Sequence, residues 1–352
     1  MPTKQAPAEA RLLELIDRMA GQPVALMADL VADRFITGSP KRISREAPVL
    51  ILRHDEERVE PGGGANAAAN VAALGGRALL VGVVGDDPNG RDLLAALERK
   101  GVATDGVWTK KGYSTPTKVR VLGGDPHGIK QQIVRFDIER PLDLNPEDLA
   151  ALGERHQALR QQAPRVAIIS DYGYGGAAPE QVHRLRELVG PQGTVLCDSR
   201  YRLAEFGGSD GVIDGATPNA EEADGLFGSA IGDTPESLCP AGHQMRRDLA
   251  VRWLLITRGS RGMSLFEADG SAHLPIHGTS QVADVTGAGD TVIGTLALAL
   301  AAGATPVEST LLANYAGGIV VMKMGTATAS PDELRRAVRR DPRPREELRW
   351  DA

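Results

Sequence analysis

The chain has 352 residues, of which 42% are hydrophobic and 24% charged, and its formal net charge is −6. This composition is typical of a soluble globular protein with a sizeable core, and the negative charge argues against nucleic acid or an anionic membrane as partner. The sequence contains neither an apolar run of roughly 20 residues, as a membrane span needs, nor the apolar core of a signal peptide, so we expect a cytoplasmic protein.

Apolar segments and glycine-rich turns alternate along the first part of the chain. A short amphipathic helix is predicted over 10–20, and a buried strand over 23–30 that runs into a loop with Asp29 and Asp33. The next predicted elements are a charged, half-exposed strand within 34–60, a glycine-rich turn and small-residue helix (61–76), a buried strand (77–85) and a helix (88–100).

The second part begins with two alternating strands, 116–123 and 130–138, which the pattern favours as a hairpin. Helices and strands then alternate. The predicted order is helix 145–160, strand 166–171, helix 179–189, strand 194–199, helices 219–227 and 241–250, strand 253–259, a β-rich stretch over 262–277, and helices near 287–302 and 306–323. From residue 333 we expect a solvated helix and a frayed end.

This alternation predicts an α/β fold, with a mostly parallel central sheet and helices on both faces, in a single domain over 1–352. Two segments, about 34–60 and 113–138, interrupt the pattern with half-exposed strands. We expect them to form a small β-stranded lid. Because exposed strand edges tend to pair with another copy, we also expect a homodimer through this lid.

The strongest motif is the run from Asp284 to Asp290, DVTGAGD, at the start of a predicted helix. Gly287 and Gly289 allow the backbone to approach a ligand closely, and the first N–H groups of a helix bind anions. Asp290 lies in the first turn. A carboxylate beside a phosphate site can accept the proton of an attacking hydroxyl, which indicates phosphoryl transfer.

This motif and the glycine-rich 62–75 segment resemble the two signatures of the ribokinase (phosphofructokinase B) family of sugar kinases, and the resemblance covers about 23–331. It implies a ribokinase-like fold, ATP and Mg²⁺, and leaves a monovalent cation open. It also implies that Asp290 is the catalytic base, that Gly287, Ala288 and Gly289 form the anion hole, and that Asp284 supports the loop.

Sugar hydroxyls need both hydrogen-bond acceptors and donors. Asp29, Asp33, Gly62, Gly63 and Asn66 supply both, and we predict that they bind the sugar. GGGAN is not a dinucleotide-binding fingerprint, because it lacks the G-x-G-x-x-G spacing after the first strand.

On the nucleotide side, Asn219 and Glu222 match the family's N-x-x-E motif, and the carboxylate of Glu222 is a candidate to hold Mg²⁺ through water. The segment 257–262 resembles the family's nucleotide loop. It supplies Gly259 and Gly262 for close approach and Arg258 for phosphate. The resemblance places Asn314 beside the adenine.

Within the family, the chain most resembles the stand-alone heptose 7-phosphate kinases of lipopolysaccharide-core synthesis, through stretches such as 41–49, 117–122, 131–135 and 170–172. These relatives convert D-glycero-D-manno-heptose 7-phosphate to the 1,7-bisphosphate with ATP. We predict that one basic residue in or near the lid meets the distal phosphate. The candidates are Arg42, Lys118, Arg120 and Arg135.

Some positions depart from that pattern. Ala28 stands where relatives have Gly, Tyr174 where they have Lys, and Ser199-Arg200 where they have Pro-Lys. Two alternatives therefore stay open, a kinase of another sugar, sugar phosphate or nucleoside, and a non-catalytic sugar-phosphate sensor on the same fold. The two cysteines, Cys197 and Cys239, belong to no C-x-x-C or Cys/His cluster in the sequence and are expected to be reduced thiols.

Overall fold

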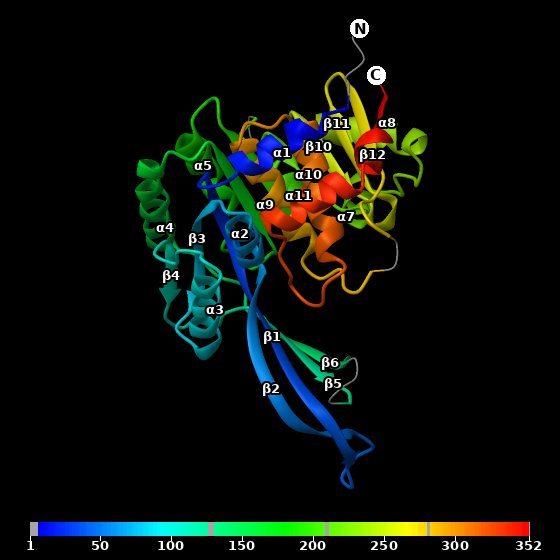
Figure 1. The fold of residues 1–352 in the computed structure, drawn as a ribbon. Coiled ribbons are helices and arrows are strands. Elements are labelled where there is room, and N and C mark those ends of the chain that lie inside the picture. Colours follow the sequence, from blue (N-terminus) through cyan, green and yellow to red (C-terminus); the bar gives the residue numbers. More distant parts are fainter. Residues whose placement is uncertain (1–5, 126–129, 208–210, 280–281, 352) are drawn as a thin grey trace.

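A large twisted sheet forms the centre of the computed structural model, which describes residues 6–125, 130–207, 211–279 and 282–351 (Figure 1). Seven neighbouring strands of this sheet, β4, β3, β1, β7, β8, β9 and β10, run parallel, and β11, β12 and β13 extend it as antiparallel strands. In spatial order the sheet contains β13 (Arg349–Asp351), β12 (Gly270–Leu274), β11 (Met263–Glu267), β10 (Trp253–Thr257), β9 (Gly215–Ala216), β8 (Thr194–Ser199), β7 (Val166–Asp171), β1 (Pro23–Ile43), β3 (Arg77–Gly85) and β4 (Val107–Lys110).

Helices cover both faces of this sheet. One face carries α1 (Glu9–Arg18), α2 (Gly64–Ala73), α3 (Pro88–Arg99), α9 (Ala288–Ala301), α10 (Pro306–Val320) and α11 (Pro331–Arg340). The other carries α4 (Pro146–Ala158), α5 (Val182–Val189), α6 (Leu203–Phe206), α7 (Ala220–Phe227) and α8 (Pro235–Asp248). The short helices are α12 (Arg343–Glu346) and the 3₁₀ turns η1 (Leu159–Gln162), η2 (Pro179–Gln181) and η3 (Gly259–Arg261).

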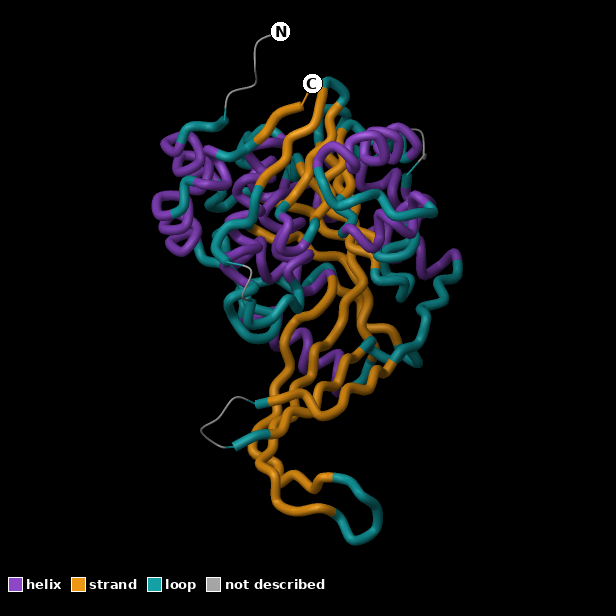
Figure 2. The backbone as a smooth tube through the Cα atoms, turned by 90° about the vertical axis from the view of Figure 1, so that its right-hand side faces the viewer, coloured by secondary structure: helices purple, strands orange, loops and turns teal. Residues whose placement is uncertain are grey.

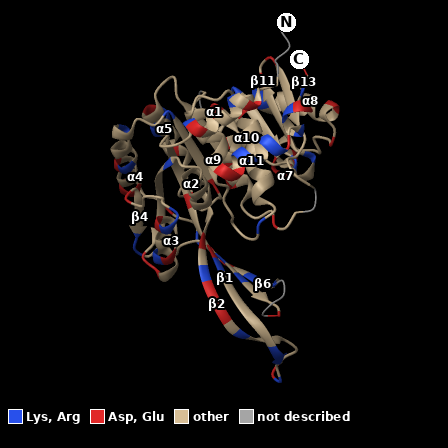
Figure 3. Cartoon of the chain, in the orientation of Figure 1, with Lys and Arg blue, Asp and Glu red and all other residues tan. Residues whose placement is uncertain are grey.

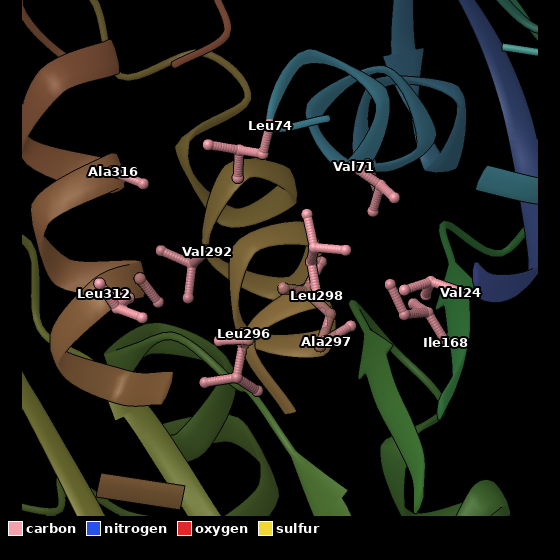
Figure 4. Close-up of a cluster of buried hydrophobic side chains, with 14 of the residues drawn as sticks. Val24, Val71, Leu74, Ile168, Val292, Leu296, Ala297, Leu298, Leu312 and Ala316 are labelled. Carbon is pink, nitrogen blue, oxygen red and sulfur yellow. The ribbon is translucent and has the colours of Figure 1, made fainter. Parts of the chain in front are cut away.

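The sequence of β1 explains why both faces are covered. Val24 and Leu26 pack into the first helical layer, and Ala25 and Met27 into the second, because successive side chains of a strand point to opposite faces. On the first face α9 packs between α2 and α10. Figure 4 shows Leu298 of α9 toward α2. This packing fixes the N-terminus of α9.

A second β-layer projects from the main sheet (Figures 1 and 2). It contains the outer part of β1, β2 (Leu50–Gly63), β5 (Thr117–Gly123) and β6 (Gln131–Ile138). The expected hairpin is confirmed, since β5 and β6 pair antiparallel. The loop expected at Asp29 and Asp33 is wrong. β1 runs unbroken through both residues, because its outer part pairs with β2 and β5.

The C-terminal segment also differs from the expectation of a solvated helix and a frayed end. Leu334 and Val338, one turn apart on α11, are buried in the core, and β13 adds an edge strand beside β12. The short strand β4 was also not expected from the sequence. Across the residues that the structure describes, no helix combines the length and apolarity needed to cross a bilayer.

Candidate active site

Asp290 is buried in the first turn of α9, with 2% of its surface exposed. Its Oδ2 accepts a hydrogen bond from Asn66 Nδ2 (2.9 Å), and its Oδ1 accepts one from the hydroxyl of Tyr172 (2.7 Å). Burial raises the pKa of Asp290 to about 7, although these two hydrogen bonds lower it. A carboxyl group with a pKa near neutral is suited to accept a proton during a reaction.

The loop before Asp290 has the features of an anion site. Gly287 has φ +75°, and a Cβ there would lie 2.4 Å from Asn66 Nδ2. Asp284 holds the loop by accepting the N–H groups of Thr286 and Gly325, both at 2.9 Å. A Cβ at Gly289 would meet nothing within 4 Å among the described residues. The surface at Gly289 is therefore open, as close approach of a ligand requires, while the N–H of Ala288 donates to the carbonyl oxygen of Val285 (3.2 Å) in this conformation.

A chain of amides fixes the orientation of Asn66. Asn70 Nδ2 donates to the side-chain Oδ1 of Asn66 (3.3 Å) and to its backbone carbonyl oxygen (2.9 Å), and the hydroxyl of Thr291 donates to Asn70 Oδ1 (3.0 Å). These bonds link α2 to α9, whose small residues allow close approach. Asn66, which we expected to bind sugar, therefore contacts the predicted base directly.

Asp33 lies beside Asp290, on the outer part of β1. It forms an ion pair with Arg120 of β5, with 2.5 Å between Arg120 Nη1 and Asp33 Oδ1. Gly62 is required here, because a Cβ would lie 2.6 Å from Asp33 Oδ2. Asp33 also raises the pKa of Asp290, which places the two carboxylates in one electrostatic environment.

Asp29 has a different role from the expected sugar contact. Its carboxylate oxygens accept the backbone N–H groups of Tyr172 (2.8 Å), Tyr174 (2.9 Å) and Gly176 (2.6 Å). Asp29 therefore shapes the turn after β7 that carries Tyr172. Gly63, with φ +54°, makes the adjacent turn into α2, and a Cβ there would lie 2.9 Å from a methyl group of Val31.

Two further carboxylates belong to the site, Asp198 and Glu222, and Asp198 interacts electrostatically with both Glu222 and Asp290. Asp198 lies in β8, and burial raises its pKa, as does its repulsion with Glu222 and Asp290. Glu222 and Asn219 form a capping box at the start of α7. The backbone N–H of Glu222 donates to Asn219 Oδ1, and the backbone N–H of Asn219 donates to Glu222 Oε2, both at 2.9 Å. Such a concentration of half-buried negative charge fits a divalent cation held by oxygen ligands. Asp198 was not predicted as a site residue, although its place at the carboxyl end of a parallel strand was a signal.

The predicted nucleotide loop lies next to this acidic group, because Thr257 bridges to Asn219 in parallel. Gly259 and Gly262 have φ of +55° and +83°. A Cβ at Gly259 would meet nothing within 4 Å among the described residues, so the loop is open there. Asn314, on α10, donates to the carbonyl oxygen of Pro275 (2.8 Å). In this conformation its amide supports the end of β12.

Arg258 does not reach the start of α9. Its guanidinium donates to the carbonyl oxygens of Arg261 (2.9 Å) and Asp233 (3.4 Å). It lines a separate cavity of about 580 Å³ together with His273 and Arg349. In this conformation the guanidinium is held by these carbonyl oxygens, and the expected phosphate contact of Arg258 stays a prediction.

A basic cavity of about 360 Å³ opens beside Tyr172, lined among others by Lys118, Arg135 and Arg200. Burial lowers the pKa of Lys118, and the charges of Arg135 and Arg200 lower it further while Asp33 opposes them. The Lys118 ammonium lies 5.4 Å from the centre of the Tyr172 ring. Asp137 and Glu139 line the same cavity, and Arg135 donates two hydrogen bonds to Asp137 (2.8 and 2.5 Å). Three cations thus face two carboxylates, and this excess of positive charge favours an anionic ligand.

Of the four predicted phosphate ligands, the structure brings only Lys118 and Arg135 to this cavity. Arg120 is paired with Asp33, and Arg42 is exposed opposite Ile51 near the far end of the β1–β2 hairpin. Figure 3 shows basic and acidic residues alternating along that hairpin. Arg200, noted only as a departure, is the additional cation.

The other departures lie nearby. Ala28 packs under the start of α2, where a Cβ on Gly64 would lie 2.4 Å from its own Cβ. The hydroxyl of Ser199 donates to Asp171 (2.6 Å). Tyr174 lines the basic cavity and donates its hydroxyl to Glu139. Ala28 and Ser199 support the site from beneath, and Tyr174 changes the wall of the cavity.

Comparison with known proteins decides the family. Residues 34–333 match the model of a protein family described as "pfkB family carbohydrate kinase". The chain belongs to this family. It is a carbohydrate kinase of the pfkB type, and the ribokinase-like fold expected from the sequence is confirmed.

Curated relatives of this pfkB kinase include the bifunctional protein HldE of Pseudomonas syringae pv. syringae, 39% identical over 91% of this chain and 64% of the relative. HldE of Magnetococcus marinus is 38% identical over 90% of this chain and 64% of the relative. The chain thus spans just under two thirds of the length of these relatives.

Among solved structures, the Arabidopsis thaliana ribokinase with ribose and ATP matches 92% of this pfkB kinase and 100% of that chain, with a TM-score of 0.68 and 21% identity. Escherichia coli phosphofructokinase-2 in complex with potassium covers 91% of this chain and 98% of its own, with a TM-score of 0.71 and 21% identity. At this identity the likeness concerns the fold.

Proposed function

We propose that this kinase transfers the γ-phosphoryl group of ATP to a hydroxyl of a sugar phosphate. D-glycero-D-manno-heptose 7-phosphate is the proposed acceptor and the 1,7-bisphosphate the product. The observation that carries the proposal is the basic cavity of Lys118, Arg135 and Arg200, which Tyr172 separates from Asp290. A phosphorylated sugar could place its phosphate in that cavity and a hydroxyl near Asp290. The similarity to HldE supports this acceptor.

Asp290 acts as the general base. Its carboxylate takes the proton of the attacking hydroxyl while the hydroxyl oxygen bonds to the γ-phosphorus and the bond to the ADP oxygen breaks. The N–H groups of Gly287, Ala288 and Gly289 stabilise the charge on the transferred group. Asn66 and Tyr172 hold the base in place. A hemiacetal hydroxyl is more acidic than an ordinary alcohol, so a base with this pKa suffices.

Glu222 and Asp198 would hold Mg²⁺, in part through water. When bound, the metal neutralises charge on the ATP phosphates. Asn219, Gly259, Gly262 and Asn314 are proposed to border the nucleotide. A monovalent cation stays a prediction, prompted also by the potassium complex of E. coli phosphofructokinase-2.

The projecting β-layer is proposed to close over the sugar as a lid and to form the homodimer contact. The outer strand β6 exposes Ile133, Phe136 and Ile138, and its free edge can pair with a second copy. We expect sedimentation of the full chain to give twice the chain mass. Phe136→Asp should shift it to the monomer mass, whereas a monomeric unsubstituted chain would contradict the lid contact.

The acceptor is tested by measuring ADP release with ATP and Mg²⁺ against several candidates. The panel contains D-glycero-D-manno-heptose 7-phosphate, sedoheptulose 7-phosphate, fructose 6-phosphate, ribose and adenosine. We expect turnover to be highest by far with the manno-heptose phosphate. Preferential turnover of another compound would keep the kinase and change the acceptor. ATP binding without any turnover would favour the sugar-phosphate sensor, against which the intact set of Asp290, Asn219 and Glu222 argues.

A further inference from the structure

A second group of ligand-type side chains converges at the far edge of the main sheet. Cys239 of α8, His273 of β12 and Asp351 of β13 bring their donor atoms within 4.8 Å of one another. His273 Nε2 lies 3.4 Å from Cys239 Sγ and 3.5 Å from Asp351 Oδ2. Figure 3 shows α8 and β13 at the same end of the molecule, close to the C-terminus. This group was not predicted from the sequence, because its members are 34 and 78 positions apart.

The imidazole of His273 is fixed in direction. It is 4% exposed, and its Nδ1 lies 2.8 Å from the hydroxyl of buried Ser264. Nε2 therefore faces Cys239 and Asp351, with the Ser271 hydroxyl also at 3.1 Å. In a nucleophile–histidine–carboxylate triad the carboxylate holds the other imidazole nitrogen. Here thiol and carboxylate approach the same nitrogen, which is the arrangement of ligands around a shared ion.

The separations around His273 agree with a tetrahedral metal. Bond lengths of about 2.3 Å for zinc–sulfur, about 2.0–2.1 Å for zinc–nitrogen and about 2.0–2.2 Å for zinc–oxygen put the nitrogen about 3.3–3.6 Å from its sulfur and oxygen neighbours. His273 Nε2 lies 3.4 Å from Cys239 Sγ and 3.5 Å from Asp351 Oδ2, and the sulfur and the carboxylate oxygen lie within 4.8 Å of each other. We propose that Cys239, His273 and Asp351 bind one zinc-type transition-metal ion, with water in the fourth position. Binding releases the thiol proton to solvent.

The surroundings favour such an ion over Mg²⁺. A thiolate and an imidazole are ligands that zinc and its neighbours prefer, whereas Mg²⁺ prefers oxygen. A neutral imidazole coordinates through the nitrogen that carries no proton, and Nε2 is the nitrogen that faces Cys239 and Asp351.

The position of this group gives a metal ion a route from solvent and a structural role. His273 lines the cavity of about 580 Å³ that also contains Arg258 and Arg349, which gives the ion a route from solvent. Asp351 pairs with Ser271 in the β12–β13 register. An ion would therefore tie α8 to the last edge strand through β12. This role is structural and independent of the proposed acceptor.

The test is a Co²⁺ titration of the full chain without nucleotide, followed by competition with Zn²⁺. We expect one equivalent to bind with a thiolate-to-cobalt charge-transfer band and tetrahedral visible bands, both removed by Zn²⁺. Because the chain has two cysteines, the band can be assigned by substitution. Cobalt bound at Asp198 and Glu222 would give no thiolate band.

Cys239→Ser should abolish the band, and Asp351→Asn should weaken binding by about 10-fold or more. Cys197→Ala is the matched control and should leave the band intact. Zn²⁺ should raise the Tm of the unsubstituted protein but not that of Cys239→Ser, whose sugar phosphorylation should be unchanged. Absence of a thiolate band in the folded protein, or its survival in Cys239→Ser, would overturn the proposal.

Discussion

Asp290→Asn is expected to lower kcat by about 10²–10⁴-fold, the usual contribution of a positioned general base. The carboxamide has nearly the same shape and can still accept the hydrogen bond from Asn66, but it cannot take up the hydroxyl proton. Since the N–H groups of the loop are unchanged, ATP binding measured by calorimetry should stay within a few-fold. Steady-state ADP release at saturating substrates measures the loss. A variant with near-normal kcat would show that another group is the base.

The same variant has an internal control in its stability. The pKa of native Asp290, about 7, lies above its ordinary value of 3.8. The native state therefore binds this proton more tightly than the unfolded chain, and stability from this group is present at low pH and lost as pH rises to about 7. Asp290→Asn removes the buried charge. Its gain in free energy of unfolding over the natural protein should thus be larger at about pH 8 than at about pH 5 in urea denaturation.

The double substitution Lys118→Gln and Arg135→Gln is expected to lower kcat/KM for the heptose 7-phosphate by about 10²-fold or more. A hydrogen bond to a charged group contributes about 1.5–3 kcal/mol, and two such contacts to the phosphate would be lost. KM should rise more than kcat falls, because Tyr172 separates the cavity from Asp290 and the reacting atoms. ADP-release kinetics over a range of sugar-phosphate concentrations measure both constants.

The control for this variant is the same heptose without its phosphate, for which natural and substituted proteins should have nearly equal kcat/KM. Arg42→Gln removes one positive charge elsewhere on the β-layer and should leave kcat/KM unchanged for both sugars. An equal loss on both sugars would mean that Lys118 and Arg135 support the lid rather than bind phosphate.

The sequence predicted the helices and strands of the main sheet well, because their apolar periodicity and glycine turns are local signals. It failed at β1, where a polar continuation after Asp29 resembles a loop until β2 and β5 supply partners for its hydrogen bonds. It also missed the burial of α11, since only Leu334, Ala337 and Val338 are buried in this otherwise charged segment.

For the site, the motif around Asp290 was sufficient to predict a buried carboxylate at a helix start, because the acidic residue and the helix start coincide in one short run. The contacts that tune it were not visible, since Tyr172 and Asn66 reach Asp290 from 118 and 224 positions away. Arg258 shows that placing a residue in a loop does not predict its side-chain partners. Its guanidinium donates to the carbonyl oxygens of Arg261 and Asp233.

The unbroken course of β1 has a mechanical consequence. The inner part of β1 pairs within the main sheet, and its outer part pairs within the projecting layer. A tilt of the layer relative to the main sheet would therefore bend β1 between Asp29 and Asp33. Asp33 would move with the layer, whereas Asp29 stays in the main sheet and holds the turn of Tyr172. In the proposed closure over a sugar, movement of the layer would therefore act, through Asp29 and the turn of Tyr172, on the hydrogen bond from Tyr172 to Asp290.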